Sequence, residues 1–347
     1  MGLRNMVGQT VEKVLGPDTT RRLRRAERAG RQRIIAALDV EGRTDTKKAK
    51  PAFGAAPAAE KVEHTRAELI ELLGQRSEMD AGSPGKLTWA SNDPAVPHPA
   101  PTMTRHQVLT HLHELVQPRT YLEIGVARGQ SLRLSRTRTI AIDPAYNIQS
   151  EIACDVRTYR TTSDKFFSGG EGLAHFDGAP IDLGFIDGMH LSEFALRDFI
   201  NVERFCTPGS VVLFDDILPR NPLEAYRVRR TSAWAGDVYK VYQTLQRLRP
   251  DLVMVLLNSA PTGTLIVANL DPQSTVLTES LPELEVQLTE ADPQVVPDEL
   301  MRRSVAVEPE AVFASDVWQR IVDLRNSGAE SGYAEVWADL NKVPRLG

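Results

Sequence analysis

The segment that most constrains the fold of this chain covers residues 121–131 and reads YLEIGVARGQS. Its first four residues predict a short, mostly apolar strand that carries a carboxylate at Glu123. Gly125 and Gly129 then bracket a tight turn, where the absence of Cβ atoms lets the backbone approach a ligand closely. We expect a helix to begin directly after Gly129, so that its free N–H groups face the turn. This order of elements indicates an α/β fold.

A second carboxylate follows the next apolar segment of the chain. Residues 139–142 predict a strand, and Asp143 comes directly after it. In α/β nucleotide-binding folds, a carboxylate at this place accepts hydrogen bonds from the ribose hydroxyls. Dinucleotide-binding folds use G-x-G-x-x-G, whereas this chain has E-x-G-x-x-x-G, with Ala127 at the position of the second glycine. The pattern therefore predicts a nucleoside site without the glycine that admits a pyrophosphate.

Alternating strand-like and helix-like segments between about residues 100 and 270 predict a doubly wound, Rossmann-like sheet of seven strands. The strands are expected at 120–124, 139–142, 156–161, 181–186, 210–214, 252–257 and 263–268, and helices near 103–115, 130–136, 191–205 and 237–248. Only the short turn 259–262 joins the last two strands, which is too short for a parallel crossover. We therefore expect an antiparallel C-terminal hairpin at the edge of the sheet.

Polar residues follow two further strands, at the sheet edge where ligands bind in open α/β folds. Asp187 and His190 follow the fourth strand in the sequence Asp-Gly-Met-His, and Asp215 and Asp216 follow the fifth. Carboxylates this close repel one another unless a cation neutralises them, and Mg²⁺ prefers carboxylate oxygens. Each residue also has an ordinary alternative role: Asp187 in a turn with Gly188, Asp216 in a loop, and His190 as a helix cap.

The E-x-G-x-x-x-G segment, together with D-G-x-H and D-D, resembles the class I S-adenosylmethionine-dependent methyltransferases. Within them it is similar to the metal-dependent macrocin-type sugar O-methyltransferases and the cephalosporin-hydroxylase-like proteins. The resemblance covers roughly residues 100–270. It implies that the methionine end of S-adenosylmethionine is lined by Glu123, Gly125 and Gly129, that Asp143 holds the ribose, and that the adenine lies near Ser163 and Asp164.

The same resemblance implies a metal site and a reaction. Asp187, Asp215 and Asp216 would bind Mg²⁺, and His190 beside Asp187 would be the catalytic base. Some of the sugar enzymes carry a carboxylate where this chain has Met189, which leaves the identity of the base open. The implied reaction is O-methylation of a small-molecule or glycoconjugate acceptor, such as a sugar, a glycolipid or a secondary metabolite. The alternatives are a hydroxylase-like enzyme of the same group and a non-catalytic cofactor-binding scaffold.

The two ends of the chain differ in composition from this α/β segment. We expect a basic helical arm and an Ala/Pro-rich linker over 1–60, the methyltransferase domain with a helical lead-in over 61–270, and an acidic extension over 271–347. The net charge of the chain is −5, but the charge is unevenly distributed, because residues 1–50 contain thirteen Lys and Arg and only six Asp and Glu. Such an arm suits an anionic surface or a homo-oligomer contact, but no aromatic residues interleave as in sequence-specific nucleic-acid binding. The extension is expected to hold one helix, 311–326.

Further sequence features indicate where the protein is located, the state of its cysteines and the kind of substrate it binds. No apolar run reaches the roughly 20 residues that span a bilayer, and the first residues lack a signal-peptide core, so a cytoplasmic enzyme is expected. Cys154 and Cys206 have no paired spacing and are expected to be buried thiols. The loop after the fifth strand is rich in arginine and is either a plain surface loop or a cover that contacts an anionic or polyhydroxylated substrate. The candidate contacts are Tyr226, Arg227, Arg229 and Arg230.

Overall fold

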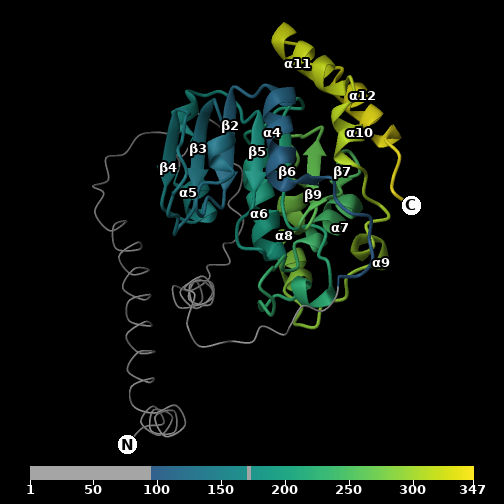
Figure 1. Cartoon of the computed structure of the whole chain (residues 1–347). Helices are drawn as coiled ribbons and strands as arrows, with labels where there is room; N and C mark the ends of the chain where they lie inside the picture. The colour runs from purple at the N-terminus through teal and green to yellow at the C-terminus, as the bar shows by residue number, and fades with distance from the viewer. Residues whose placement is uncertain (1–94, 170–172) are drawn as a thin grey trace, which may run out of the picture. The chain divides into compact units, whose positions relative to one another are not determined.

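The computed structural model describes residues 95–169 and 173–347 (Figure 1). All of the described residues belong to one compact unit. The expected basic arm, the Ala/Pro linker and the helical lead-in all lie outside the described residues. The expected domain boundary near residue 60 lies outside them as well, and the boundary at 270 stays a prediction.

Seven strands form one sheet in the order β4-β3-β2-β5-β6-β9-β7. The strands are β2 (Thr120–Ile124), β3 (Arg138–Ile142), β4 (Val156–Tyr159), β5 (Leu183–Ile186), β6 (Val211–Phe214), β7 (Val253–Leu257) and β9 (Thr264–Ala268). The first five run parallel, whereas β9 is antiparallel to both β6 and β7. The doubly wound sheet and its antiparallel hairpin are therefore confirmed. The order reverses between β2 and β5, which is where ligands bind in open α/β sheets.

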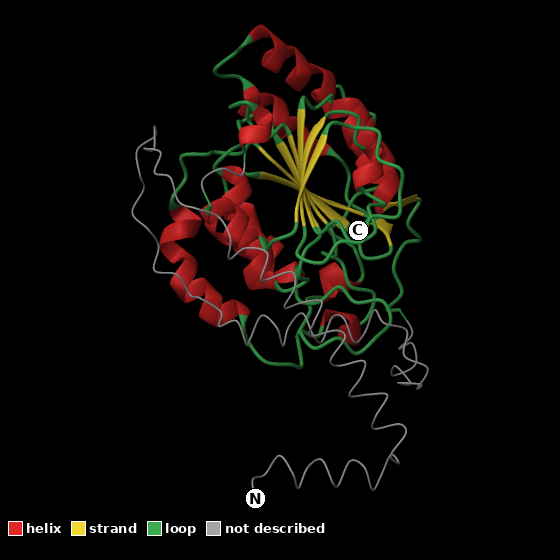
Figure 2. Ribbon diagram, turned by 90° about the vertical axis from the view of Figure 1, so that its left-hand side faces the viewer, coloured by secondary structure: helices red, strands yellow, loops and turns green. Residues whose placement is uncertain are grey.

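Helices cover both faces of the twisted sheet (Figure 2). One face packs against α5 (Ser163–Ser168), α6 (Ser192–Glu203), α7 (Tyr239–Leu248) and α8 (Val276–Leu288). The other face packs against α4 (Arg105–Val116), α10 (Pro309–Phe313), α11 (Val317–Ser327) and α12 (Tyr333–Trp337). Successive strand residues alternate between the two cores, as Tyr121 and Leu122 do. Both faces of β2, β5, β6 and β9 are thus buried, and β5, β6 and β9 have nearly continuous apolar sequences, whereas the edge strand β4 is partly exposed.

The helix expected over 130–136 is wrong. The chain forms only a short 3-10 turn there, η2 (Leu132–Leu134). The connection between β2 and β3 spans only residues 125–137, and its first part is taken up by the glycine turn. Too little chain remains for an α-helix, so the glycine turn does not face an α-helix N-terminus.

The C-terminal region contains more helices than the single one expected over 311–326. That segment divides into α10 and α11, and α8, α9 (Asp298–Met301) and α12 are helical too. The division falls at Ser315, whose Oγ accepts a hydrogen bond of 3.3 Å from the Val317 N–H and so competes with continuous helix. The break lets the Trp318 indole donate to the Val312 carbonyl oxygen at 2.9 Å.

Two features of the chain bear on its environment and its thiols. Among the described residues, no helix is both long and apolar enough to cross a membrane. Both cysteines are free thiols; Cys206 is buried as expected, whereas Cys154 is partly exposed. The expectation of a buried thiol is therefore wrong for Cys154.

Replacing Trp337 by alanine should lower the free energy of unfolding by about 3–5 kcal/mol, because a fully buried aromatic side chain leaves a large cavity. Trp337 is 0% exposed, and its ring packs edge-on against Trp318 with 5.7 Å between centroids. Its indole N–H donates to the Pro208 carbonyl oxygen at 2.7 Å. Urea denaturation measures the loss, and Glu335→Ala, at an exposed position of the same helix, is the control. A loss below about 1 kcal/mol would show that α12 is not an integral part of the core.

Candidate functional site

The glycine turn after β2 lies against the end of β5. Gly125 has a φ of 94°, and a Cβ added there would lie 1.8 Å from the Asp187 carbonyl oxygen. The Asp187 N–H donates to the Ile124 carbonyl oxygen at 2.9 Å, which fixes this approach. Gly129 has a φ of 77°, and its Cβ would lie 3.0 Å from Ile148 Cγ2. The two glycines therefore let the turn pass directly over the edge that carries Asp187.

Asp143, directly after β3, holds this turn in shape. Its Oδ2 accepts the Ala127 N–H at 2.9 Å and its Oδ1 accepts the Ala145 N–H at 2.6 Å. Ala127 itself has a φ of 46°, a left-handed conformation that such bonds stabilise. An ionised carboxylate offers about four acceptor positions, so Asp143 retains capacity for further donors. Its contact with a ribose stays a prediction.

Glu123 lies beneath the turn and is 0% exposed. Tyr121 Oη donates to its Oε2 at 2.7 Å, and Ser131 Oγ donates to its Oε1 at 2.8 Å. Burial raises the pKa of Glu123 to about 8, although the two hydrogen bonds oppose this rise. The carboxyl group thus ties the start of the η2 segment to β2, and its contact with a cofactor stays a prediction.

Ser163 and Asp164 begin helix α5 and connect it to α6. Ser163 Oγ donates to the carboxylate of Asp198, and Asp164 lies 3.2 Å from Arg197 Nη2. Asp198 is almost fully buried, and burial raises its pKa to about 7. Arg197 also bonds Glu285 of α8 at 2.6 Å. The described side-chain contacts of Ser163 and Asp164 are therefore with α6, and their contact with an adenine stays a prediction.

Asp187, His190 and Asp216 converge at the carboxyl edge of β5 and β6. His190 Nε2 lies 3.0 Å from Asp187 Oδ1, and His190 Nδ1 lies 3.0 Å from Asp216 Oδ2. One ligand atom from each lies within 4.8 Å of the others, a spacing that suits a metal ion. Thr262 Oγ1 donates to Asp216 Oδ1 at 2.6 Å. His190 and Asp216 have φ values of 56° and 61°, so their backbone is held in the left-handed region.

Asp215 lies apart from this group of three. Its Oδ2 accepts a hydrogen bond from Arg105 Nη1 at 2.5 Å, and its Oδ1 is buried without a hydrogen-bond partner among the described residues. Burial, followed by the charge of Asp216, raises the pKa of Asp215 to about 8, and Arg105 opposes this rise. Burial also raises the pKa of Asp216, while His190 opposes it. Two of the three expected metal ligands thus meet His190, and the third pairs with an arginine.

A loop between β6 and α7 covers His190. The Trp234 ring stacks on the imidazole with 5.2 Å between centroids and an angle of 23° between planes. The Trp234 carbonyl oxygen lies 2.9 Å from His190 Nδ1. A Cβ on Gly236, whose φ is 61°, would lie 1.7 Å from the His190 carbonyl oxygen. The loop therefore fixes both the ring and the backbone of His190.

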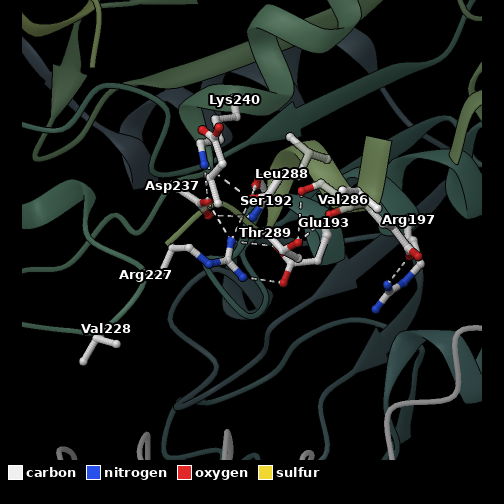
Figure 3. A network of polar contacts seen from close by, with 12 residues as sticks. Ser192, Glu193, Arg197, Arg227, Val228, Asp237, Lys240, Val286, Leu288 and Thr289 are labelled. Atoms are coloured by element: carbon white, nitrogen blue, oxygen red, sulfur yellow. Dashed lines mark hydrogen bonds and ion pairs between the residues drawn. The ribbon is translucent and has the colours of Figure 1, made fainter. Parts of the chain in front are cut away.

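Arg227 anchors this covering loop through ion pairs, and its expected contact with a substrate stays a prediction. Figure 3 shows its guanidinium between Glu193 of α6, Asp237 just before α7, and Leu288 at the end of α8. It bonds Glu193 at 2.6 Å, Asp237 at 2.7 Å and the Leu288 carbonyl oxygen at 3.0 Å. Arg229 likewise donates to the Thr231 carbonyl oxygen at 3.1 Å, within the loop itself.

Asp187, Asp215 and Asp216, at the carboxyl ends of β5 and β6, form what we call the acidic edge. The sequence did not predict three residues that line it: Arg105, Trp234 and Thr262. Each comes from a segment remote in sequence from the D-G-x-H and D-D motifs. Thr262 lies in the hairpin turn before β9, and Arg105 begins the helix that precedes β2. The only sequence signal was the length of that hairpin turn, which brings residues 259–262 next to β6.

Comparisons with known proteins agree with this arrangement. Residues 122–217 match a protein family described as a methyltransferase domain. The match runs from β2 to the loop after β6 and so includes the glycine turn, Asp143 and the acidic edge. No curated protein matches the sequence.

Solved structures resemble parts of the fold. The O-methyltransferase TomG of Streptomyces achromogenes, solved with SAM, is 19% identical, covering 60% of this chain and 92% of its own, with a TM-score of 0.36. An O-methyltransferase of Bacillus cereus is 17% identical, covering 58% and 90%, with a TM-score of 0.35. The MycE methyltransferase of mycinamycin biosynthesis, solved with Mg and SAH, is 16% identical, covering 47% and 48%, with a TM-score of 0.33.

At these scores the structural likenesses are partial, and the conclusion rests on the domain match together with the strand order. The domain match covers the glycine turn and Asp143, and both lie at the switch point of a seven-stranded sheet with an antiparallel hairpin. Residues 122–217 are therefore similar to a methyltransferase domain, and they lie in a seven-stranded sheet that contains an antiparallel hairpin.

Proposed function

We propose that the protein is an O-methyltransferase that uses a divalent metal ion, Mg²⁺ by preference, and methylates a hydroxyl of a sugar, a glycolipid or a secondary metabolite. One observation carries this proposal: the glycine turn and the acidic edge are in direct contact. The Cβ position of Gly125 lies only 1.8 Å from the carbonyl oxygen of Asp187, and Asp187 lies beside His190 and Asp216. A cofactor held by the turn would therefore present its reactive methyl group next to the proposed base and ligands.

The cofactor would be held by the backbone of the turn and by Asp143. The turn brings Gly125, Ala127 and Gly129 into left-handed conformations that expose backbone atoms. Asp143 keeps acceptor capacity beyond its two bonds to the Ala127 and Ala145 N–H groups, which suits the two hydroxyls of a ribose. In the proposal, Glu123 supports the turn from beneath through its bond with Ser131.

The residues of the acidic edge fit a divalent cation. Asp187 and Asp216 supply carboxylate oxygens, and the buried Asp215 Oδ1 without a hydrogen-bond partner is an oxygen available to a third bond. Carboxylate oxygens are the ligands that Mg²⁺ and Mn²⁺ prefer. When bound, such an ion would lower the pKa of an acceptor hydroxyl. The family analogy suggests a sugar-like acceptor, but the described residues do not by themselves select one.

His190 is the proposed general base. The Trp234 ring stacks on its imidazole, and the close approach of Gly236 fixes its backbone beside Asp187 and Asp216. The two ring nitrogens of His190 face Asp187 Oδ1 and Asp216 Oδ2, so a proton from the hydroxyl would be accepted only at a nitrogen whose carboxylate partner has turned to the metal ion. Asp187, at 3.0 Å from Nε2, would orient the ring and stabilise the positive charge that it gains. Burial of Asp216 beneath the same ring strengthens this electrostatic effect.

A second candidate is a hydroxylase-like enzyme of the same group. The donors closest together are two carboxylates and one imidazole, a mixed set that redox-active iron also accepts. A requirement for a reductant and dioxygen would identify this activity. Product formation that depends on S-adenosylmethionine alone would exclude it as the main reaction.

Release of S-adenosylhomocysteine tests the proposed function. The purified full-length protein would be incubated with S-adenosylmethionine, Mg²⁺ and a panel of sugars, catechols and lipid extracts. We expect release with at least one hydroxyl-bearing acceptor and none with His190→Ala. Release that continues unchanged in His190→Ala would remove this residue from the mechanism, and release only with amine acceptors would contradict O-methylation.

Asp143→Ala should weaken S-adenosylmethionine binding by about 1.5–3 kcal/mol, the scale of a hydrogen bond to a charged group. The loss has two sources, because Asp143 holds both the proposed ribose site and the Ala127 backbone. Calorimetric titration measures the affinity, and Asp155→Ala, at an exposed carboxylate paired with Arg138, is the control. Unchanged affinity in Asp143→Ala, or equal binding of NADH by the native protein, would refute the assignment.

A further inference from the structure

Arg105 occupies a fixed position beside the acidic edge. It is the first residue of α4, and the Thr104 side chain caps this helix by accepting the Gln107 N–H at 3.3 Å. The preceding strand β1 (Met103–Thr104) pairs in parallel with β8 (Ser259–Ala260), next to the hairpin turn that carries Thr262. The strand pairing and the helix cap thus place the Arg105 backbone, and its side chain is not a freely mobile surface group.

The contact between Arg105 and Asp215 joins a partly exposed guanidinium to a buried carboxyl group. Arg105 Nη1 lies 2.5 Å from Asp215 Oδ2, and the two side chains are 31% and 1% exposed. Asp215, and more weakly Asp187 and Asp216, raise the pKa of Arg105 further above its ordinary value. The guanidinium therefore lies in the field of all three carboxylates, and its described hydrogen bond is with Asp215.

The carboxylates of the acidic edge are divided between two nitrogen-bearing side chains. His190 faces Asp187 and Asp216, whereas Arg105 faces Asp215. A buried carboxylate is strongly destabilising without a partner, so the contact with Arg105 stabilises Asp215. A divalent cation at the same edge would bring two positive charges close to the guanidinium. The two cations would repel each other, and Asp215 could not bond both without a cost.

We propose that Arg105 is an internal counter-ion that holds Asp215 in the metal-free enzyme and competes with the divalent cation, so that its charge sets the metal affinity. This inference rests on the proposed function, because it requires the cation at the acidic edge. Arg105 acts here as a positioning residue and not as a catalytic one. Its partly exposed side chain has access to solvent, where the guanidinium is hydrated once Asp215 is released.

Metal titration of the full-length protein tests this competition, with Mn²⁺ as the probe. The protein would first be freed of metal with a chelator, and binding would be measured by calorimetry and by the electron paramagnetic resonance signal of free Mn²⁺. Arg105→Gln should bind Mn²⁺ about tenfold more tightly than the native protein, or better, because the competing charge is gone. Arg105→Lys, which keeps the charge, should stay within about threefold of the native affinity.

Arg119→Gln is the matched control. Arg119 also pairs with a buried carboxylate, Asp182, through bonds of 2.9 Å, but Asp182 directly precedes β5 and so lies at the opposite edge of the sheet from Asp187. Its removal should lower stability without a change in Mn²⁺ affinity. A second readout is thermal unfolding, in which Mn²⁺ should raise the Tm of Arg105→Gln by more than it raises that of the native protein.

The outcomes separate this inference from the proposed function. Equal or weaker Mn²⁺ binding by a folded Arg105→Gln overturns the inference alone. Absence of Mn²⁺ binding in both the native protein and the variant overturns the metal proposal, and the inference with it. Arg105→Met, which keeps the aliphatic stem, carries the same expectation if the glutamine variant does not fold. A glutamine variant that folds only with Mn²⁺ present supports the competition.

Discussion

Turnover should stop when a chelator removes divalent cations and should return when Mg²⁺ or Mn²⁺ is added. Asp216→Asn should lower the rate by about a hundredfold or more, since it removes a buried carboxylate from the group that also contains Asp187 and His190. Affinity for S-adenosylmethionine should stay within a few-fold, because the proposed nucleoside site is built from β2 and β3. The initial rate of S-adenosylhomocysteine release and a calorimetric titration measure the two effects.

The control for Asp216→Asn is Asp177→Asn. Asp177 is an exposed carboxylate that pairs with Arg138 at 2.6 Å, away from the acidic edge, and its neutralisation should leave the rate unchanged. Full activity of the native protein in chelator, with a purified acceptor, would remove the metal ion from the mechanism. His190 would then act as a base without a metal ion. Asp187 and Asp216 would serve only to orient its ring and to stabilise its protonated form.

The sheet was accessible from the sequence because buried parallel strands read as short apolar runs. Leu183–Ile186 and Val211–Phe214 have no polar residue, and the polar groups begin directly where these strands end. The antiparallel hairpin followed from the length of the turn before Thr264 alone. The absence of the helix expected over 130–136 could not be predicted in this way. It depends on how much of the connection 125–137 the glycine turn takes up.

The detailed composition of the acidic edge was not accessible from the sequence. Asp215 and Asp216 are adjacent, and successive residues at the end of a strand point to different sides. Only a tertiary contact, between Asp215 and Arg105, decides which of the two joins His190. The stacking of Trp234 on His190 was not predictable from the sequence either. It depends on the conformation of a loop that Arg227 ties to Glu193 of α6.

Gly125→Ala should abolish measurable cofactor binding and weaken Mn²⁺ binding at the same time. The new Cβ would lie 1.8 Å from the Asp187 carbonyl oxygen, and Gly125 has a φ of 94°, so the backbone of the turn or of the β5 end must move. Each strain costs about 1–3 kcal/mol, and the free energy of unfolding should fall by at least about 2 kcal/mol. The Asp187 backbone contacts the turn, and its side chain is a proposed metal ligand. The added methyl group should therefore displace both the nucleoside site and the metal site.

Gly178→Ala separates the steric effect from the backbone effect. Gly178 has a similar φ of 81°, but a Cβ there would meet no atom within 4 Å. This variant should lose about 1–3 kcal/mol of stability while keeping native affinity for S-adenosylmethionine and Mn²⁺. If Gly125→Ala loses stability to the same degree and still binds both ligands, the contact between the turn and the β5 end does not couple the two sites. Loss of both affinities in Gly125→Ala alone would show that the nucleoside site and the acidic edge share one rigid backbone junction.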